Sequence, residues 1–162
     1  MSSEMVKVDI CCGRFKPEGF IGVDRIQLEG VDIVHNLDES FPFEDNSVDY
    51  LRAHDAIEHL PDKIKTMNEI WRVCKHGATV DIKVPSTDGR GAFQDPTHVS
   101  YWNIHSFYYY TSQHPDLYQF CTSYGFKGNF LLETIFDTGG DDRVIHTNVM
   151  MKVFKDVGTI GR

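Results

Sequence analysis

The intervals between the first predicted strands constrain the fold more than any other feature of this sequence. Short runs rich in β-branched residues and bounded by turn-forming residues occur at 5–11, 20–24 and 31–35. About nine residues separate the first run from the second, and about seven separate the second from the third. A crossover between parallel strands usually takes a dozen or more residues, including its helix. If these strands are parallel, both crossovers are loops and one face of the sheet lacks its usual helices.

The next part of the chain indicates that the strands are parallel. Apolar residues recur with a helical period over 64–74, Asp62 is placed to cap the start of this helix, and Gly77 follows its end. Runs at 47–54 and 78–84 flank the helix and have the composition of strands. Strand, helix and strand in this order predict a parallel α/β sheet.

The C-terminal half completes the sheet. Runs at 131–138 and 144–155 are predicted strands, and the last is expected to pair antiparallel. The segment 85–102 has no clear periodicity, and connections of that length are often functional; SFYYY at 106–110 is predicted to be a short helix or turn. The fold class is therefore α/β: a Rossmann-like, mostly parallel sheet with an antiparallel C-terminal strand and with the first crossover helices reduced to loops, in one domain over 1–162.

Alternating residues support a sheet with one bare face. Apolar and polar residues alternate along 6–11 and along 79–84, whereas parallel strands that are covered on both faces are apolar throughout. One face is expected to pack against the helix at 64–74. The other is expected to be solvated, or covered by the aromatic-rich C-terminal half or by a second subunit, and we therefore predict a homodimer.

Composition limits the partners. The 162 residues carry a formal net charge of -8 at pH 7 without a cluster of Lys and Arg, so nucleic acid is disfavoured as a partner. No apolar run approaches the roughly 20 residues of a membrane span, and the first residues lack a signal pattern. We therefore expect a cytoplasmic protein that does not bind membranes. The four cysteines form no C-x-x-C pair and are expected to be reduced structural thiols.

A glycine after the first strand and an acid at the end of the second predict a nucleoside site. Gly13 lets the backbone approach a ligand closely, and Asp24 can accept hydrogen bonds from two ribose hydroxyls. The helix N-terminus that would bind pyrophosphate has no room between them. The pair therefore favours a nucleoside without phosphates, although Asp24 could instead be a turn residue at the end of a strand.

Five motifs then follow in a fixed order: VDICCG, IGVD, PFEDNSVD, EHL and EIWRVCKHG. As an ordered set they resemble the class I S-adenosylmethionine-dependent methyltransferases, and within them the small branch with a type 11 domain. The resemblance covers roughly Val6 to Val84. It implies a Rossmann-like fold, S-adenosyl-L-methionine as the cofactor and methyl transfer as the activity.

The resemblance also implies roles for residues at the carboxyl ends of the strands. Asp24 would hold the ribose hydroxyls, and His54 would lie near the methionyl carboxylate and the sulfonium. The full set of expected cofactor-binding residues is Cys11, Cys12, Gly13, Arg14, Asp24, Asn36, Leu37, Asp38, Ala53 and His54. The chain departs from the family's G-x-G here, because Arg14 and Phe15 follow Gly13.

The segment AFQDPTHVSYW at 92–102 is expected to lie over the methyl group of the cofactor. Methyl transfer is an in-line displacement, and a hydroxyl or amine acceptor must also lose a proton. Asp95 and His98 are the candidates for a base or an acid–base pair, and His54 is a further catalytic candidate. The structural alternative is that Asp95 and Pro96 form a turn while His98 packs against it.

Three interpretations of function follow from the sequence. The first is a methyltransferase that acts on a small-molecule acceptor, and the second is a non-catalytic protein or partner subunit that binds S-adenosylmethionine or S-adenosylhomocysteine. The third, a dinucleotide-dependent reductase, is disfavoured because the pyrophosphate-binding helix is missing.

Two further patterns are interpreted conservatively. No metal site is expected, because the histidines and Asp95 show no H-x-x-x-H spacing and the cysteines no C-x-x-C spacing; the residues considered were His54, His59, His98, His105 and Asp95. Asp55 and Glu58 have the spacing of a capping box, so Glu58 is predicted first to cap a short turn and only second to contact a ligand.

Overall fold

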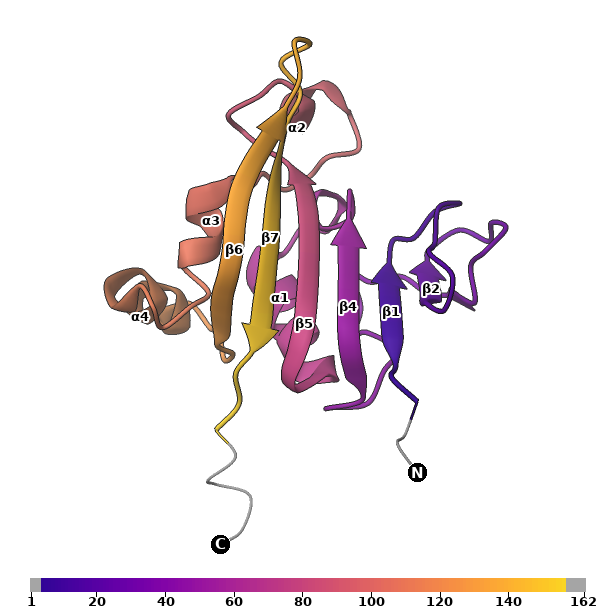
Figure 1. Ribbon diagram of the computed structural model, residues 1–162, viewed down its shortest axis with the longest axis horizontal. Helices are drawn as coiled ribbons and strands as arrows, with labels where there is room; N and C mark the ends of the chain where they lie inside the picture. Colours follow the sequence, from indigo (N-terminus) through magenta and orange to yellow (C-terminus); the bar gives the residue numbers. More distant parts are fainter. Residues whose placement is uncertain (1–3, 157–162) are drawn as a thin grey trace, which may run out of the picture.

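A mixed sheet with helices on one side forms the frame of the molecule in the computed structural model, which describes residues 4–156 (Figure 1). Its seven strands lie in the order β3-β2-β1-β4-β5-β7-β6. They are β1 (Lys7–Ile10), β2 (Ile21–Asp24), β3 (Ile33–Val34), β4 (Val48–His54), β5 (Cys74–Pro85), β6 (Phe130–Gly139) and β7 (Ile145–Val153). The helices are η1 (Ile57–His59), α1 (Lys63–Val73), α2 (Gly91–Gln94), α3 (Ile104–Tyr108) and α4 (Pro115–Ser123). Strands β1 to β5 pair in parallel, and β7 runs antiparallel to both β5 and β6. The predicted fold class is confirmed.

Loops join the first four strands, as the short intervals predicted. Asp32 ties two of these loops together: one of its oxygens accepts from Lys16 Nζ at 2.5 Å and from the backbone N–H of Gly22 at 2.7 Å. The packing there is tight, because a Cβ at Gly22 would lie 2.7 Å from Cys12 Sγ and 2.9 Å from the Gly30 carbonyl oxygen. Close loop packing therefore takes the place of the missing helices at this edge of the sheet.

Helix α1 covers one face of the sheet and lies behind it in Figure 1. Met67, Ile70 and Val73 of the helix are fully buried. Alternate strand residues on the same face of the sheet pack in this core, among them Val8, Ile10, Leu51, Ala53, Val80, Ile82, Val84, Val149, Met151 and Val153. The apolar half of the alternating pattern therefore faces α1, as predicted.

The predictions for the two ends of α1 differ in how well they agree with the structure. Asp62 is the N-cap, and its side chain accepts a hydrogen bond from the N–H of Lys65 at 2.9 Å, which confirms the predicted start. The predicted end at Gly77 is wrong. Cys74 is already extended and pairs with Val48 in the sheet, whereas Gly77 (φ +77°) lies in the irregular first part of β5. Strand pairing ends the helix before the glycine is reached.

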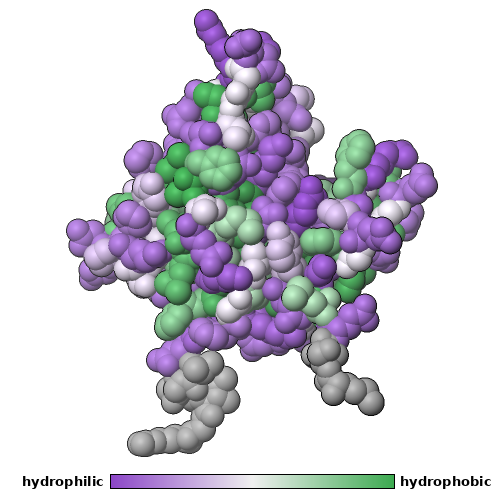
Figure 2. Space-filling model, viewed as in Figure 1, coloured by the Kyte–Doolittle hydropathy of each residue, from purple (hydrophilic) through white to green (hydrophobic). Residues whose placement is uncertain are grey.

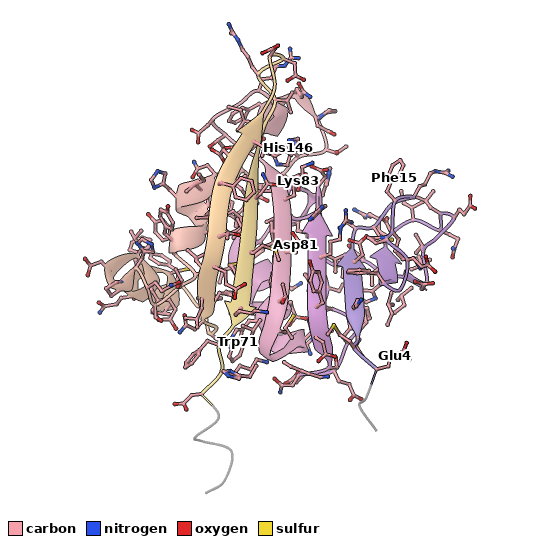
Figure 3. All side chains as sticks on the ribbon, in the orientation of Figure 1. Glu4, Phe15, Trp71, Asp81, Lys83 and His146 are labelled. Atoms are coloured by element: carbon pink, nitrogen blue, oxygen red, sulfur yellow. The ribbon has the colours of Figure 1, made fainter. Side chains whose placement is uncertain are left out.

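The opposite face of the sheet has no helix over it among residues 4–156, and it faces the viewer in Figure 1. Polar side chains cross it from β1 to β5, and Asp81 and Lys83 are seen there in Figure 3. Figure 2 shows that apolar atoms gather over β6 and β7, where Leu131 and Phe136 are exposed and Met150 is half-buried. We call this side of the sheet the bare face.

The aromatic-rich C-terminal half does not cover the bare face, so this part of the prediction is wrong. Trp102 and Phe107 are fully buried in the core on the α1 side, with their rings stacked 5.3 Å apart. Helix α4 belongs to the same layer and was not predicted, although its signals are present: Pro115 stands in its first turn and Gly125 (φ +102°) follows its end. SFYYY contains the end of α3, as expected. None of the helices within 4–156 combines the length and apolarity that a bilayer crossing requires.

Candidate functional site

A cavity of about 530 Å³ opens at the carboxyl ends of the first strands. Residues that follow β1, β2 and β3 line one side of it, and residues around η1 and the segment after α2 line the other. The polar members of the lining include Asp24, His35, Asn36, Asp38, Asp55, His59 and Thr97. Ligands of open α/β sheets bind at this edge. The three carboxylates outnumber Arg25, the one Lys or Arg side chain in the lining, so the cavity favours a ligand that carries positive charge.

Asp24 holds the loop after β1 in place. Its Oδ2 accepts a hydrogen bond from the N–H of Gly13 at 2.9 Å, and its Oδ1 accepts from the N–H of Ile26 at 3.2 Å. Each carboxylate oxygen has a second lone pair, so both can still accept bonds from a ligand. A Cβ at Gly13 (φ +53°) would meet nothing within 4 Å, so the space beside this turn is open. Asp24 is thus both a turn residue and a cavity residue, which are the two roles that the sequence left open.

The structure brings half of the predicted cofactor residues to the cavity. Five of them line it: Cys11, Asp24, Asn36, Leu37 and Asp38. Gly13 lies against Asp24, and Arg14 is exposed on the loop beyond it. Burial raises the pKa of Cys11 to about 12, and the nearby Asp24 carboxylate adds to the shift, so this lining thiol is neutral.

Cys12, Ala53 and His54 do not line the cavity. Cys12 and Ala53 are buried. His54 lies on the bare face because strand alternation turns it away from Ala53, and there its Nε2 lies 2.9 Å from Asp81 Oδ1. The position of His54 on the bare face therefore argues against the expectation that it lies beside the cofactor.

His54 belongs to a polar network on the bare face instead. Tyr50 donates its hydroxyl to Asp81 Oδ2 at 2.9 Å. Burial and this bond to a carboxylate raise the pKa of Tyr50 to about 12. Burial alone would raise the pKa of Asp81, but the hydrogen bonds from His54 and Tyr50 lower it. The network is built around an ionised Asp81.

The predicted catalytic pair Asp95 and His98 meets in a compact turn. Asp95 Oδ1 accepts from the N–H and the hydroxyl of Thr97 at 2.8 and 2.6 Å, so the turn interpretation holds. Asp95 Oδ2 lies 3.7 Å from His98 Nε2. The His98 side chain is only 7% exposed, and its Nδ1 lies 3.0 Å from the carbonyl oxygen of Ala92.

Glu58 does not have the capping role that the sequence predicted first for it. The turn η1 is capped by Ala56 without any side-chain bond, so the predicted capping box is wrong. Glu58 is 2% exposed, and neither carboxylate oxygen has a hydrogen-bond partner among the described residues. Burial raises the pKa of Glu58 to about 8, and the carboxylates of Asp55 and Asp95 act in the same direction. The N–H groups of Glu58 and Ala56 lie near enough to oppose this shift without forming hydrogen bonds of normal geometry.

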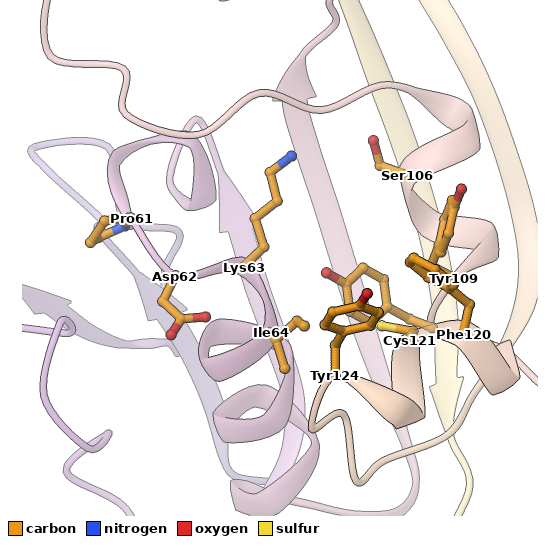
Figure 4. A pocket seen from close by; sticks show the side chains of 10 residues that line it. Pro61, Asp62, Lys63, Ile64, Ser106, Tyr109, Phe120, Cys121 and Tyr124 are labelled. Atoms are coloured by element: carbon orange, nitrogen blue, oxygen red, sulfur yellow. The ribbon is translucent and has the colours of Figure 1, made fainter. Parts of the chain in front are cut away.

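A second cavity of about 640 Å³ lies between the start of α1 and the helices α3 and α4 (Figure 4). In Figure 4, Lys63 and Ile64 face the rings of Tyr109, Phe120 and Tyr124 across it. Burial lowers the pKa of Lys63, whose Nζ donates to the carbonyl of Tyr101 and lies 5.0 Å from the ring of Trp102. Pro61 lines both cavities, so the two are neighbours.

The first part of the chain matches a described family of domains. Residues 4–81 match the methyltransferase domain family Methyltransf_11. A demethylmenaquinone methyltransferase of Listeria welshimeri is 27% identical over 110 residues, an alignment that covers 51% of this chain and 47% of the relative. The chain spans about half the length of the curated relatives of this kind that it matches.

Solved structures match the whole fold at low sequence identity. The YcgJ protein from Bacillus subtilis has a TM-score of 0.65 and 15% identity, with 94% of this chain and 93% of that chain covered. A protein from Methanosarcina mazei described as a SAM-dependent methyltransferase has a TM-score of 0.64 and 14% identity, with 96% and 95% covered. At these identities the similarity concerns the fold, and it extends beyond the matched half to the C-terminal strands.

Proposed function

We propose that the chain is a class I S-adenosylmethionine-dependent methyltransferase, because residues 4–81 match a methyltransferase domain family and the fold matches that of solved methyltransferase structures. On this proposal it binds S-adenosylmethionine in the cavity at the ends of β1, β2 and β3 and methylates a small molecule. The observation that carries this proposal is the position of Asp24. Asp24 is the last residue of β2, and its carboxylate lines the cavity. The carboxylate keeps unused lone pairs beside an open backbone turn.

The residues present fit this cofactor. Asp24 would accept bonds from the two ribose hydroxyls, and Asn36, Leu37 and Asp38 would lie along the adenine. The loop between β1 and β2 contains no helix whose N-terminus could hold a phosphate. Carboxylates in the lining favour the cationic sulfonium, which supplies the activated methyl group when the cofactor is bound.

Proton removal from the acceptor is assigned to the pair Asp95 and His98. The two side chains face each other across 3.7 Å, and Thr97 between them lines the cavity. Hydrogen bonds from Thr97 lower the pKa of Asp95, so its carboxylate is ionised and available to orient an acceptor. His54 is not proposed as a base, because it hydrogen-bonds to Asp81 on the bare face.

A small, partly aromatic acceptor is the substrate class that the neighbouring cavity supports. Tyr109, Phe120 and Tyr124 give this second cavity aromatic walls, and Pro61 joins its rim to the cofactor cavity. Aromatic rings favour a flat apolar partner. The relatives named demethylmenaquinone methyltransferase point toward a small molecule as well.

Isothermal titration with S-adenosylmethionine tests the binding site. Asp24→Ala removes both carboxylate oxygens and is expected to weaken binding by about a hundredfold or more, because two hydrogen bonds to a charged group contribute about 1.5–3 kcal/mol each. Asp24→Asn can still accept from Gly13, so it separates loss of ligand contacts from collapse of the turn. Asp45→Ala, which removes an exposed partner of Arg72, is the matched control and should bind like the parent. Equal affinity in parent and Asp24→Ala would refute the site.

Turnover separates the enzyme from a non-catalytic binding protein. The parent is incubated with S-adenosylmethionine and a library of small hydroxyl and amine compounds, and S-adenosylhomocysteine is measured. The double variant Asp95→Ala/His98→Ala is expected to lose turnover while it still binds the cofactor. Binding without turnover in the parent would favour the alternative, a non-catalytic protein or subunit; full turnover in the double variant would refute the assigned pair.

A further inference from the structure

Glu58 poses a problem that the proposed methyl transfer does not solve. Its carboxylate is almost completely buried, and both oxygens are without a hydrogen-bond partner in the described part of the chain. Burying a polar group without a partner is costly, and a buried carboxylate is normally paired with a cation, coordinated to a metal or neutralised. The groups nearest to the carboxylate that could pair with it or share a metal ion with it should therefore indicate the role of Glu58.

Two histidines converge on this carboxylate. One ring nitrogen each from His59 and His98 and one oxygen of Glu58 all lie within 4.8 Å of one another. His98 Nε2 is 3.9 Å from Glu58 Oε1, and the two imidazole rings meet edge to face with their centroids 5.0 Å apart. The three side chains come from two segments of the chain. These segments are held together because the backbone carbonyl of Glu58 accepts hydrogen bonds from the N–H groups of Val99 and Ser100. This pairing fixes the histidines against the carboxylate.

In each imidazole, Nδ1 faces a backbone carbonyl. His98 Nδ1 lies 3.0 Å from the carbonyl oxygen of Ala92, and His59 Nδ1 lies 3.2 Å from that of Thr97. A proton on Nδ1 satisfies each carbonyl and leaves Nε2 with a free lone pair. Histidines that bind metals are usually oriented in this way, by a hydrogen bond from the non-coordinating nitrogen to a carbonyl or carboxylate.

We propose that Glu58, His59 and His98 form a binding site for one divalent transition-metal ion of the zinc type. Two imidazoles and one carboxylate are a ligand set that suits such ions, whereas Mg²⁺ and Ca²⁺ prefer oxygen ligands alone. Metal–ligand bonds of about 2.0–2.2 Å place tetrahedral ligand atoms about 3.3–3.6 Å apart, so the ligand atoms must approach one another by at most about 1.5 Å on binding.

The site lies beside the proposed cofactor cavity, since His59 and Thr97 line that cavity. Three protein ligands leave a fourth position, and an ion there could polarise an acceptor oxygen. With His98 as a ligand, Asp95 is the remaining member of the assigned pair that can take a proton. The inference does not rest on methyl transfer, because it concerns metal binding by the protein alone.

Titration of the cofactor-free protein with Co²⁺ and Zn²⁺ tests the proposal. One equivalent of Co²⁺ should give visible absorption bands of four- or five-coordinate cobalt, without the near-ultraviolet band that thiolate ligands would add from the cysteines. Calorimetry should give one Zn²⁺ site per chain. Glu58→Gln and His98→Ala are each expected to weaken Zn²⁺ binding by about a hundredfold or more, beyond the 10- to 100-fold typical of outer-shell changes.

Matched controls keep the test specific. His105→Ala and Glu29→Gln remove one exposed histidine and one exposed carboxylate elsewhere, and both should bind Zn²⁺ like the parent. Glu58→Gln is nearly isosteric, so thermal unfolding without metal should be unchanged or shifted upward, while the stabilisation by Zn²⁺ seen in the parent disappears. The proposal is overturned if the parent binds no Zn²⁺ with one-to-one stoichiometry, or if Glu58→Gln binds it equally well. Neither result would affect cofactor binding at Asp24.

Discussion

The two faces of the sheet are built from the same strands but differ in how they are stabilised. On the side of α1, every second residue of β5 is apolar and fully or almost fully buried, from Ala78 to Val84. On the bare face, the residues between them are polar, and Thr79 and Asp81 form hydrogen bonds in the place where the crossover helices of a parallel sheet would lie.

The comparison shows how a sheet can lose helices on one side without losing its fold. The covered face supplies the hydrophobic stabilisation, because α1, Trp102 and Phe107 are buried against it. The bare face replaces apolar cover with paired charges, of which Asp9 and Arg52 are the most buried pair. Stability should therefore depend on the covered face much more than on the bare one.

Truncation on the covered face is expected to have the largest effect. Ile82 is fully buried in the core, so Ile82→Ala should lower the free energy of unfolding by about 2–5 kcal/mol, measured by urea denaturation. Thr79→Ala is the control from the bare side of the same strand. It removes one hydrogen bond from Lys152 and should cost about 0.5–1.5 kcal/mol. Equal losses in the two variants would contradict the assignment of stability to one face.

The second prediction concerns the ion pair on the bare face. Arg52 donates to both oxygens of Asp9, whose side chain is 1% exposed, whereas Arg52 is 22% exposed. Arg52→Ala leaves the carboxylate buried without its partner and should cost about 2 kcal/mol at pH 7, less than a fully buried pair because solvent reaches Arg52.

The pH dependence of this variant has a defined sign. Burial raises the pKa of Asp9 above its ordinary value, and Arg52 opposes that rise. A carboxyl group with a raised folded pKa gains a proton more readily in the folded state, so it stabilises the fold as the pH falls through that window. The removal of Arg52 raises the pKa further. The difference between Arg52→Ala and the parent should therefore shrink as the pH is lowered, and a difference that grew would contradict the burial of Asp9.

The fold could be predicted because its main determinants are local. The interval between Ile10 and Ile21 excludes a crossover helix, and alternation along β5 shows which residues face α1. Helix α4 was missed because its buried side is short: Cys121 is its only buried residue within the described chain. The position of the aromatic layer depends on long-range packing, which no local pattern specifies.

The candidate site was predicted less completely, for the same reason. Asp24 and the residues after β3 could be placed because they end strands whose carboxyl ends share one edge of the sheet. His54 was expected beside the cofactor, but successive residues of a strand point to opposite faces, and His54 lies on the bare face next to Asp81. Glu58 and His98 come together only through the backbone pairing of η1 with the segment after α2, and that contact joins residues far apart in the sequence.

A third and smaller effect is expected at the start of α1. Asp62→Ala removes the bond to the N–H of Lys65 and should lower the free energy of unfolding by about 1 kcal/mol. Asp62→Asn, which can still cap the helix, should retain most of that stability. Circular dichroism during urea denaturation measures both, and an unchanged midpoint in Asp62→Ala would show that packing against the sheet, rather than the cap, fixes this end of the helix.

The smallest effect on folding is expected from the apolar strip of the bare face, although its effect on assembly should be large. Leu131 and Phe136 are exposed there beside Met150, and the predicted homodimer would cover them. Light scattering at micromolar concentrations should give the mass of two chains for the parent and of one chain for Phe136→Lys. At concentrations low enough to dissociate the dimer, the substitution should change the free energy of unfolding by less than about 0.5 kcal/mol, because the Phe136 side chain is exposed. A parent of monomeric mass throughout would mean that the bare face stays in water, and that its ion pairs alone replace the helices that the loops left out.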